Sequence, residues 1–182
     1  MAVLIHTVLP TEEGLAVREL LKERFRISSS LRRELFRREN TILLNGKVIF
    51  LSTRAHTGDV LTVDVSDPPA ASSVVPVDYP LTVLWEDEHL LAVDKPAGIT
   101  VHGAALTEEA VTVAGAAAHY LSSSAVHVVN RLDRGTSGVM LIAKNSYMHA
   151  RCMELLHTES LQREYRAICE GVPSPAVGII DA

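Results

Sequence analysis

The sequence lacks the features that would point to export or membrane insertion. Its two cysteines, Cys152 and Cys169, have no CxxC spacing, which suits reduced thiols in a cytosol. The first ten residues carry no basic segment, and Glu12 and Glu13 follow quickly, so this stretch does not resemble a signal peptide. No run approaches the ~18 apolar residues of a membrane span. These absences predict a cytoplasmic protein without a membrane anchor.

Metal and nucleotide motifs are missing as well. The eight histidines are scattered, and His149 and His157 are too far apart for the i, i+4 pair of a helical zinc site. Neither a GxxxxGK(S/T) phosphate loop nor a GxGxxG turn occurs. What the chain does have is 182 residues that are 47% hydrophobic, enough for the core of one domain or of two small ones. We therefore expect a globular protein without a metal site.

Charge is distributed unevenly along the chain. The formal net charge is −5. Between Gly14 and Phe50, nine lysines or arginines stand against four glutamates, so this segment has a balance of +5 and the remainder carries −10. A basic segment on an otherwise acidic protein is typical of an electrostatic docking module.

Hydrophobic spacing and turn residues predict the elements of this basic segment: helices over about 15–26 and 31–38, a hairpin over 41–51 and a strand over 60–65. The serines at 28–30 offer N-cap hydroxyls for the second helix, and Asn45-Gly46 forms the hairpin turn. The candidate docking residues lie on that helix and hairpin: Arg32, Arg33, Arg37, Arg38 and Lys47. A simpler interpretation is that Arg37 and Arg38 only complement the helix macrodipole.

Residues 66–80 contain four prolines and break both periodicities, which predicts a linker. The elements expected beyond it are a hairpin over 81–93, helices over 108–121 and 145–157, and strands over 124–129, 139–143 and 161–169. The predicted fold class is thus α+β, with a small first domain over 1–65 and a second over 81–182 that has a mixed, mainly antiparallel sheet.

The most informative stretch is 130–138, which reads Asn-Arg-Leu-Asp-Arg-Gly-Thr-Ser-Gly. Asp133 lies between two arginines and is followed by glycines that allow close backbone approach. Such a loop can hold a carboxylate, ionised by the neighbouring cations, where an anionic polymer passes and guanidinium groups bind its phosphates. The same residues also fit a structural Asp–Arg pair in a turn.

Three ordered motifs resemble the RluA-type RNA pseudouridine synthases. Residues 131–138 match the family's catalytic HRLDxxTSG, although Asn130 stands where the family usually has His. Residues 94–102 resemble its upstream NKPAGxxVH, with Asp94 in place of Asn, and 163–167 resemble its downstream KxYxA, with Arg in place of Lys. Ahead of these motifs, the two helices, the Asn-Gly hairpin and the last strand resemble the S4 RNA-binding domain.

The resemblance implies isomerisation of uridine to pseudouridine in ribosomal or transfer RNA, without a cofactor. It implies that Asp133 acts either as a nucleophile at C1′ or as a base toward the ribose, and that Arg131 fills the stack left by an extruded uridine and pairs with Asp133. Tyr165 would serve the proton step at C5 and stack under the uracil; the alternative is a strand tyrosine in the core. Arg134 would hold phosphate, and Lys95 and His102 either line the site or only shape the hairpin.

Other functions stay open at this point. A non-catalytic RNA-binding protein would need only the basic amino-terminal part, and a lyase or hydrolase could use Asp133 on a small ligand. Synthases of this family continue well past residue 182, and the β-like run Val177 to Ile180 has no obvious partner strand after it. We therefore expect a fragment that turns over RNA poorly or not at all, with open sheet edges that favour association.

Overall fold

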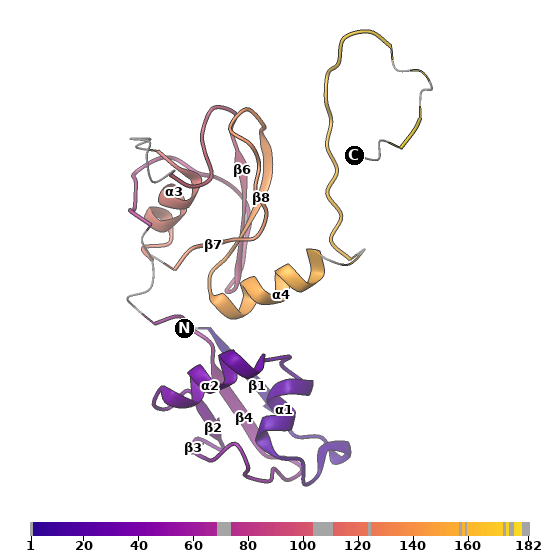
Figure 1. Ribbon diagram of the computed structural model, residues 1–182. Helices are drawn as coiled ribbons and strands as arrows, with labels where there is room; N and C mark the ends of the chain where they lie inside the picture. Colours follow the sequence, from indigo (N-terminus) through magenta and orange to yellow (C-terminus); the bar gives the residue numbers. More distant parts are fainter. Residues whose placement is uncertain are drawn as a thin grey trace.

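The computed structural model describes residues 2–68, 74–103, 111–123, 125–156, 158, 160–172, 174 and 177–179. These residues contain two four-stranded sheets and four α-helices (Figure 1). The strand orders are β1-β4-β2-β3 and β5-β6-β8-β7, and all neighbouring strands are antiparallel. The predicted α+β class with mainly antiparallel sheets is confirmed.

The first sheet and its helices come from the amino-terminal third of the chain. The elements are β1 (Val3–Thr7), a 3₁₀ turn (Pro10–Glu12), α1 (Val17–Glu23), α2 (Ser29–Arg37), β2 (Ile42–Leu44), β3 (Lys47–Val48) and β4 (Val60–Asp64). Ser28 caps α2, because its hydroxyl accepts a hydrogen bond from the amide of Leu31 at 3.2 Å. Asn45 and Gly46 both have positive φ, 53° and 74°, as a tight hairpin turn requires. Both predicted helices and the hairpin are confirmed: α1 and the hairpin strands are shorter than expected, whereas α2 begins two residues earlier.

Strand β1 was not predicted from the sequence. It pairs with β4 along its whole length, from Val3 opposite Asp64 to Thr7 opposite Val60. The core between this sheet and its helices is formed by fully buried residues: Val17, Leu20, Leu21, Leu35, Leu61 and Val63. The basic helix α2 is therefore fixed on a packed sheet through its apolar face.

The second sheet lies between two helices. Its elements are β5 (Thr82–Glu86), β6 (Leu90–Lys95), α3 (Val113–Tyr120), β7 (His127–Val128), β8 (Gly138–Ala143) and α4 (Ser146–Leu156). Because side chains alternate along a strand, Leu91 and Ile142 pack toward α3, whereas Leu90 and Leu141 pack toward α4. The predicted hairpin, the strand over 139–143 and both helices are confirmed within the described residues.

The predicted linker contains no helix or strand among its described residues, 66–68 and 74–80. Both of its described parts are nevertheless attached to the second half of the chain. Asp67 accepts hydrogen bonds from the amide of Ser146 and from the His127 ring, and the amide of Val77 donates to the carbonyl of Gly115 at 3.0 Å. The division into domains at 65 and 81 remains a prediction.

The strand predicted over 161–169 is wrong. The described residues 160–172 form no ladder and follow α4 as a trace without helix or strand (Figure 1). The alternation of this segment fits a strand, but a strand exists only where another strand supplies hydrogen-bond partners. Residues 177–179 are also irregular. Residues 108–110, Ser124, His157 and Ile180, which fall in other predicted elements, lie outside the described residues.

Candidate active site

The loop 130–138 joins β7 to β8 and is held from below by a buried lysine. Lys95, the last residue of β6, is 1% exposed. Its ammonium group donates hydrogen bonds to the carbonyls of Pro96, Arg134 and Thr136 at 3.0, 3.3 and 2.7 Å. A buried cation is tolerated only when its donors are matched, and here three donors meet three carbonyls. Lys95 therefore fixes the path of the backbone around Asp133.

A second pair of bonds closes the same contact. The amide of Gly98 donates to the carbonyl of Arg134 at 2.7 Å, and the Nε of Arg134 donates to the carbonyl of Gly98 at 3.0 Å. Gly98 has φ +96°, a backbone conformation that residues other than glycine rarely adopt. The segment 94–102 and the loop 130–138, more than thirty residues apart, are thus clamped together, which brings two of the sequence motifs to one place.

The pKa values of Lys95 and His102 also reflect the closeness of the segment 94–102 to the loop 130–138. Burial lowers the pKa of the Lys95 ammonium, and the charge of Asp133 opposes that shift. Desolvation lowers the pKa of the His102 imidazole, with a further contribution from the charge of Arg131. His102 is an exposed residue, whereas Lys95 is not. For Lys95 this geometry favours the second of its two predicted roles, shaping the hairpin, over direct contact with RNA.

Asn130, which departs from the family pattern, continues the β7–β8 ladder with its side chain. Its Oδ1 accepts from the amide of Leu141 at 2.7 Å, and its Nδ2 donates to the carbonyl of Val139 at 3.2 Å. The amide of Val129 donates to the carbonyl of Leu141 just before it. Asn130 therefore fastens the start of the loop to β8, which sequence reasoning could not see because the pairing depends on register.

The charged residues at the tip of the loop face solvent. Asp133, Arg131 and Arg134 are all exposed. Within the described part of the chain, Asp133 forms no ion pair with Arg131, so the predicted pair between them is absent here. The carbonyl of Asp133 accepts from the amide of Thr136 at 3.0 Å, which makes a tight turn directly after the carboxylate. The loop thus presents Asp133 outward on a fixed turn.

A cavity of about 610 Å³ lies beside this loop. Its walls include Asn130, Leu132 and residues 136–138 of the loop, and they are completed by the irregular segment 161–166, which includes Tyr165. Tyr165 is 60% exposed, which rules out the alternative of a core tyrosine in this structure. The cavity brings Tyr165 to the loop, but Asp133 is not among the residues that line it.

The candidate docking residues differ in how free they are. Arg32 donates to the carbonyl of Arg18 at 3.1 Å, and Arg33 donates to the carbonyl of Ser29 at 3.2 Å. Arg37 and Arg38 have no side-chain partner among the described residues, and Lys47 is exposed at the hairpin. The free guanidinium groups are therefore at the carboxyl end of α2.

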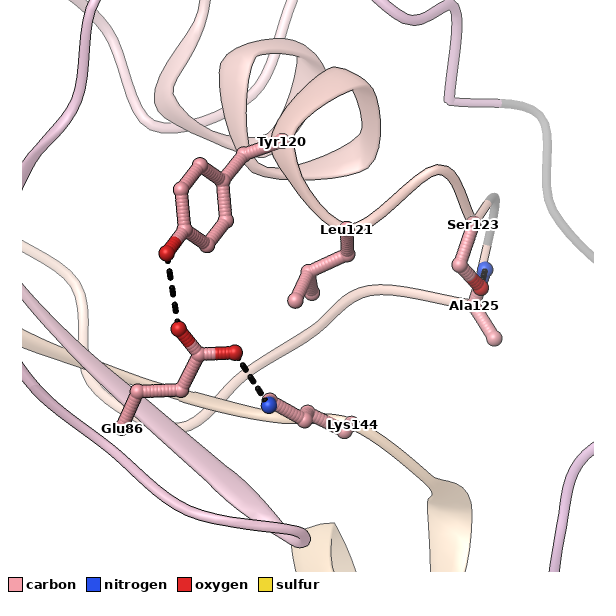
Figure 2. Close-up of a pocket in the computed structure, with 6 residues that line it drawn as sticks. All are labelled: Glu86, Tyr120, Leu121, Ser123, Ala125 and Lys144. Atoms are coloured by element: carbon pink, nitrogen blue, oxygen red, sulfur yellow. Dashed lines mark hydrogen bonds and ion pairs between the residues drawn. The ribbon is translucent and has the colours of Figure 1, made fainter. Parts of the chain in front are cut away.

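A second cavity, of about 390 Å³, lies at the opposite end of the second sheet (Figure 2). There Glu86 pairs with Lys144 at 2.6 Å and accepts from the hydroxyl of Tyr120 at 2.8 Å. The Lys144 bond, with the Tyr120 bond as a lesser cause, lowers the pKa of the Glu86 carboxyl. These three side chains are hydrogen-bonded to one another and connect β5, α3 and the end of β8. Their contacts are therefore explained by a structural role.

The described residues contain no group of three or more His, Cys, Asp or Glu side chains placed to hold a metal ion. None of the helices there is both long enough and apolar enough to cross a membrane.

Residues 89–182, which hold the clamped loop and Tyr165, match the RNA pseudouridylate synthase family. The chain belongs to that family. The match does not extend to residues 1–88, so the resemblance of the first part to an S4 domain remains a prediction.

The chain is 34% identical over 152 residues to an uncharacterized RNA pseudouridine synthase of Mycobacterium tuberculosis, covering 79% of this chain and 49% of that protein. It is 31% identical to the uncharacterized RNA pseudouridine synthase YlyB of Bacillus subtilis, covering 80% and 50%. It is 38% identical to ribosomal large subunit pseudouridine synthase D of Zymomonas mobilis, covering 68% and 41%. The chain therefore spans about half the length of the curated relatives it matches.

Proposed function

We propose that this chain carries the RNA-docking part and the Asp133 loop of an RNA pseudouridine synthase. One observation carries the proposal: hydrogen bonds from the buried Lys95 and between Gly98 and Arg134 hold the turn that presents the exposed Asp133 between two arginines, inside the region that matches the family. A catalytic group needs such fixed support from the residues around it. The names of the relatives support the reaction class.

In the proposed reaction the N1–C1′ bond of a uridine breaks, the uracil turns, and C5 bonds to C1′. Asp133 acts at the ribose, as a nucleophile at C1′ or as a base, and its exposure leaves room for RNA. The uridine is extruded from its stack at a cost of a few kcal/mol, and Arg131 takes the vacated place. Arg134, whose backbone is clamped, holds a phosphate. Tyr165, on the irregular segment 161–166, borders the site and takes part in removing the proton from C5.

The substrate is proposed to be ribosomal or transfer RNA, and the first domain is proposed to dock it. The +5 balance between Gly14 and Phe50 and the free guanidinium groups of Arg37 and Arg38 support this role. Two unbridged cysteines support the prediction of a cytoplasmic location.

The proposal is tested by incubating RNA transcripts with two proteins and detecting uridine adducts that resist removal after carbodiimide treatment. The first protein is this chain; the second continues it with the carboxy-terminal half of the Bacillus subtilis relative. We expect pseudouridine from the second protein and little or none from the first. Equal activity of both, with a monodisperse monomer for the first, would show that the fragment hypothesis is wrong. If neither protein forms pseudouridine, the proposed reaction is wrong.

A second candidate, a non-catalytic RNA-binding protein, is favoured by the separation of Asp133 from the cavity that Tyr165 lines. Replacing Arg32, Arg33, Arg37 and Arg38 with Gln tests the docking surface that both candidates share. Each lost phosphate contact should reduce the slope of log K against log salt by roughly 0.7 to 0.9. An unchanged slope would mean that these arginines face plain solvent.

A further inference from the structure

Three large apolar side chains are exposed around one small cavity in the first domain. Phe36 at the end of α2 is 45% exposed, Val48 of β3 is 66% exposed, and Phe50 just after β3 is 74% exposed. All three line a cavity of about 270 Å³ between the end of α2 and the hairpin. A single exposed apolar residue is ordinary, but several that share one hollow mark a binding surface.

The same cavity is lined by the two free arginines. Arg37 and Arg38 border it, and no described residue bonds their guanidinium groups, in contrast to Arg32 and Arg33, which donate to backbone carbonyls. Glu39 is the one acidic residue in the lining, so the rim is net positive. Aromatic faces beside unpaired cations suit a ligand that is flat, apolar on its faces and negatively charged at its edge.

We propose that this hollow, which we call the Phe36–Phe50 groove, binds one unpaired nucleobase of a single-stranded RNA segment. The base stacks on Phe50 and Phe36, and Arg37 and Arg38 bind the adjoining phosphates. Bases stack on aromatic side chains only when they are free of a duplex, and such stacking combined with a basic groove is how single strands are bound without sequence readout. The inference rests on the proposed RNA docking and adds where, and in which form, the RNA is bound.

Charge decides between RNA and a protein partner. The groove lies in the segment whose balance is +5, and the side chains of Arg37 and Arg38 are paired with none of the described residues. A protein partner would need a matching acidic surface, whereas every nucleotide supplies one phosphate beside one base. The structure therefore favours single-stranded RNA.

The test measures binding of a labelled oligoadenylate, which contains no uridine and so cannot report catalysis. Fluorescence anisotropy against salt concentration compares the chain with its Phe50→Ala, Phe36→Ala and Phe50→Trp variants. Trp85→Ala serves as the matched control, because Trp85 is 51% exposed but belongs to the second sheet. A strand with 2-aminopurine in place of one adenine reports stacking directly.

We expect each alanine variant to weaken binding roughly 5- to 100-fold with an unchanged salt slope, since no phosphate contact is lost. Phe50→Trp should keep the affinity, Trp85→Ala should change nothing, and the quenching of 2-aminopurine should disappear in Phe50→Ala. A blunt duplex should bind alike to all variants.

If Phe50→Ala binds the single strand as tightly as the unchanged chain, the groove does not hold a base, while RNA docking through the arginines stands. If the variants instead lose only self-association of the chain, the groove is a protein interface and the inference is overturned. If the unchanged chain binds the duplex but no single strand even at low salt, this inference is overturned and the docking role stands; if it binds neither, both fail.

Discussion

At the scale of single residues, the site depends on a lysine whose role the sequence left undecided. The motif match placed Lys95 near Asp133, but only the packing of β6 under the loop shows that its ammonium group is buried and bonded to three carbonyls. The structure places Asp133, Arg131 and Arg134 together at the exposed tip of the loop, and their roles stay predictions. The sequence could not show that the side-chain amide of Asn130 makes the hydrogen bonds to β8 that backbone groups make in a ladder, because these bonds depend on the register of β8.

Lys95→Met should destabilise the loop and lower any turnover. The substitution keeps the length of the side chain but leaves carbonyls without a donor in a buried place, which costs about 1–3 kcal/mol. Urea unfolding measures the loss, and Lys22→Met, at an exposed lysine of α1, is the control. Equal stability of the two variants would show that the Lys95 bonds contribute nothing.

A buried carboxylate, Glu12, makes the stability of the amino-terminal part of the chain depend on pH. Burial alone would raise the pKa of Glu12, but the amide of Leu9 and the side chains of His6 and Arg24 lower it to about 2 from an ordinary value of 4.5. Because this pKa is lowered in the folded state, the ionised Glu12 contributes fully to the free energy of unfolding above pH 4.5. That contribution is lost as the pH falls toward 2.

Glu12→Gln should therefore cost about 2 kcal/mol at neutral pH and flatten the fall in unfolding free energy between about pH 5 and 2. Its neighbour Glu13 also has a pKa of about 2 but is exposed, so Glu13→Gln is a matched control with a smaller effect. Thermal unfolding across this pH range tests the difference. Identical pH profiles for both variants would contradict a special role of Glu12.

At the scale of elements, local signals predicted well and non-local ones did not. The serine cap of α2 and the Asn-Gly turn are local, and both are present. β1 was missed because its strand character comes from pairing with β4, more than fifty residues later. The segment 161–169 was wrongly predicted as a strand for the converse reason: alternation without a partner strand does not form a ladder.

The start of α4 is held by the linker, which local signals also could not show. Asp67 accepts from the amide of Ser146 at 3.1 and 3.0 Å and pairs with His127 at 2.6 Å. Asp67→Ala should cost about 1 kcal/mol, as loss of a helix cap does, and should speed hydrogen exchange at the first turn of α4. Asp78→Ala, at an exposed linker acid, should do neither. Unchanged exchange in Asp67→Ala would show that α4 needs no cap from the linker.

At the scale of the whole molecule, the two sheets are connected by side chains as well as by the chain. Tyr147 of α4 packs with the core of the first sheet, and its hydroxyl donates to the carbonyl of Phe25 at 2.9 Å. A basic first part and an Asp133 loop in the second are thus carried by one connected structure. Nothing in the sequence predicted Tyr147 as the contact between them.

The central claim is that Asp133 is the catalytic carboxylate of an RNA-modifying loop. The most direct measurement is carbodiimide-resistant uridine in RNA treated with the chain continued to family length, in three forms: unchanged, Asp133→Asn and Asp94→Asn. Asp94 is also exposed and lies on β6, and Asn is what the family usually has there, so it controls for loss of an acid near the loop. We expect product from the unchanged and Asp94→Asn proteins and none from Asp133→Asn, with RNA binding retained by all three. Turnover retained by Asp133→Asn would contradict the claim.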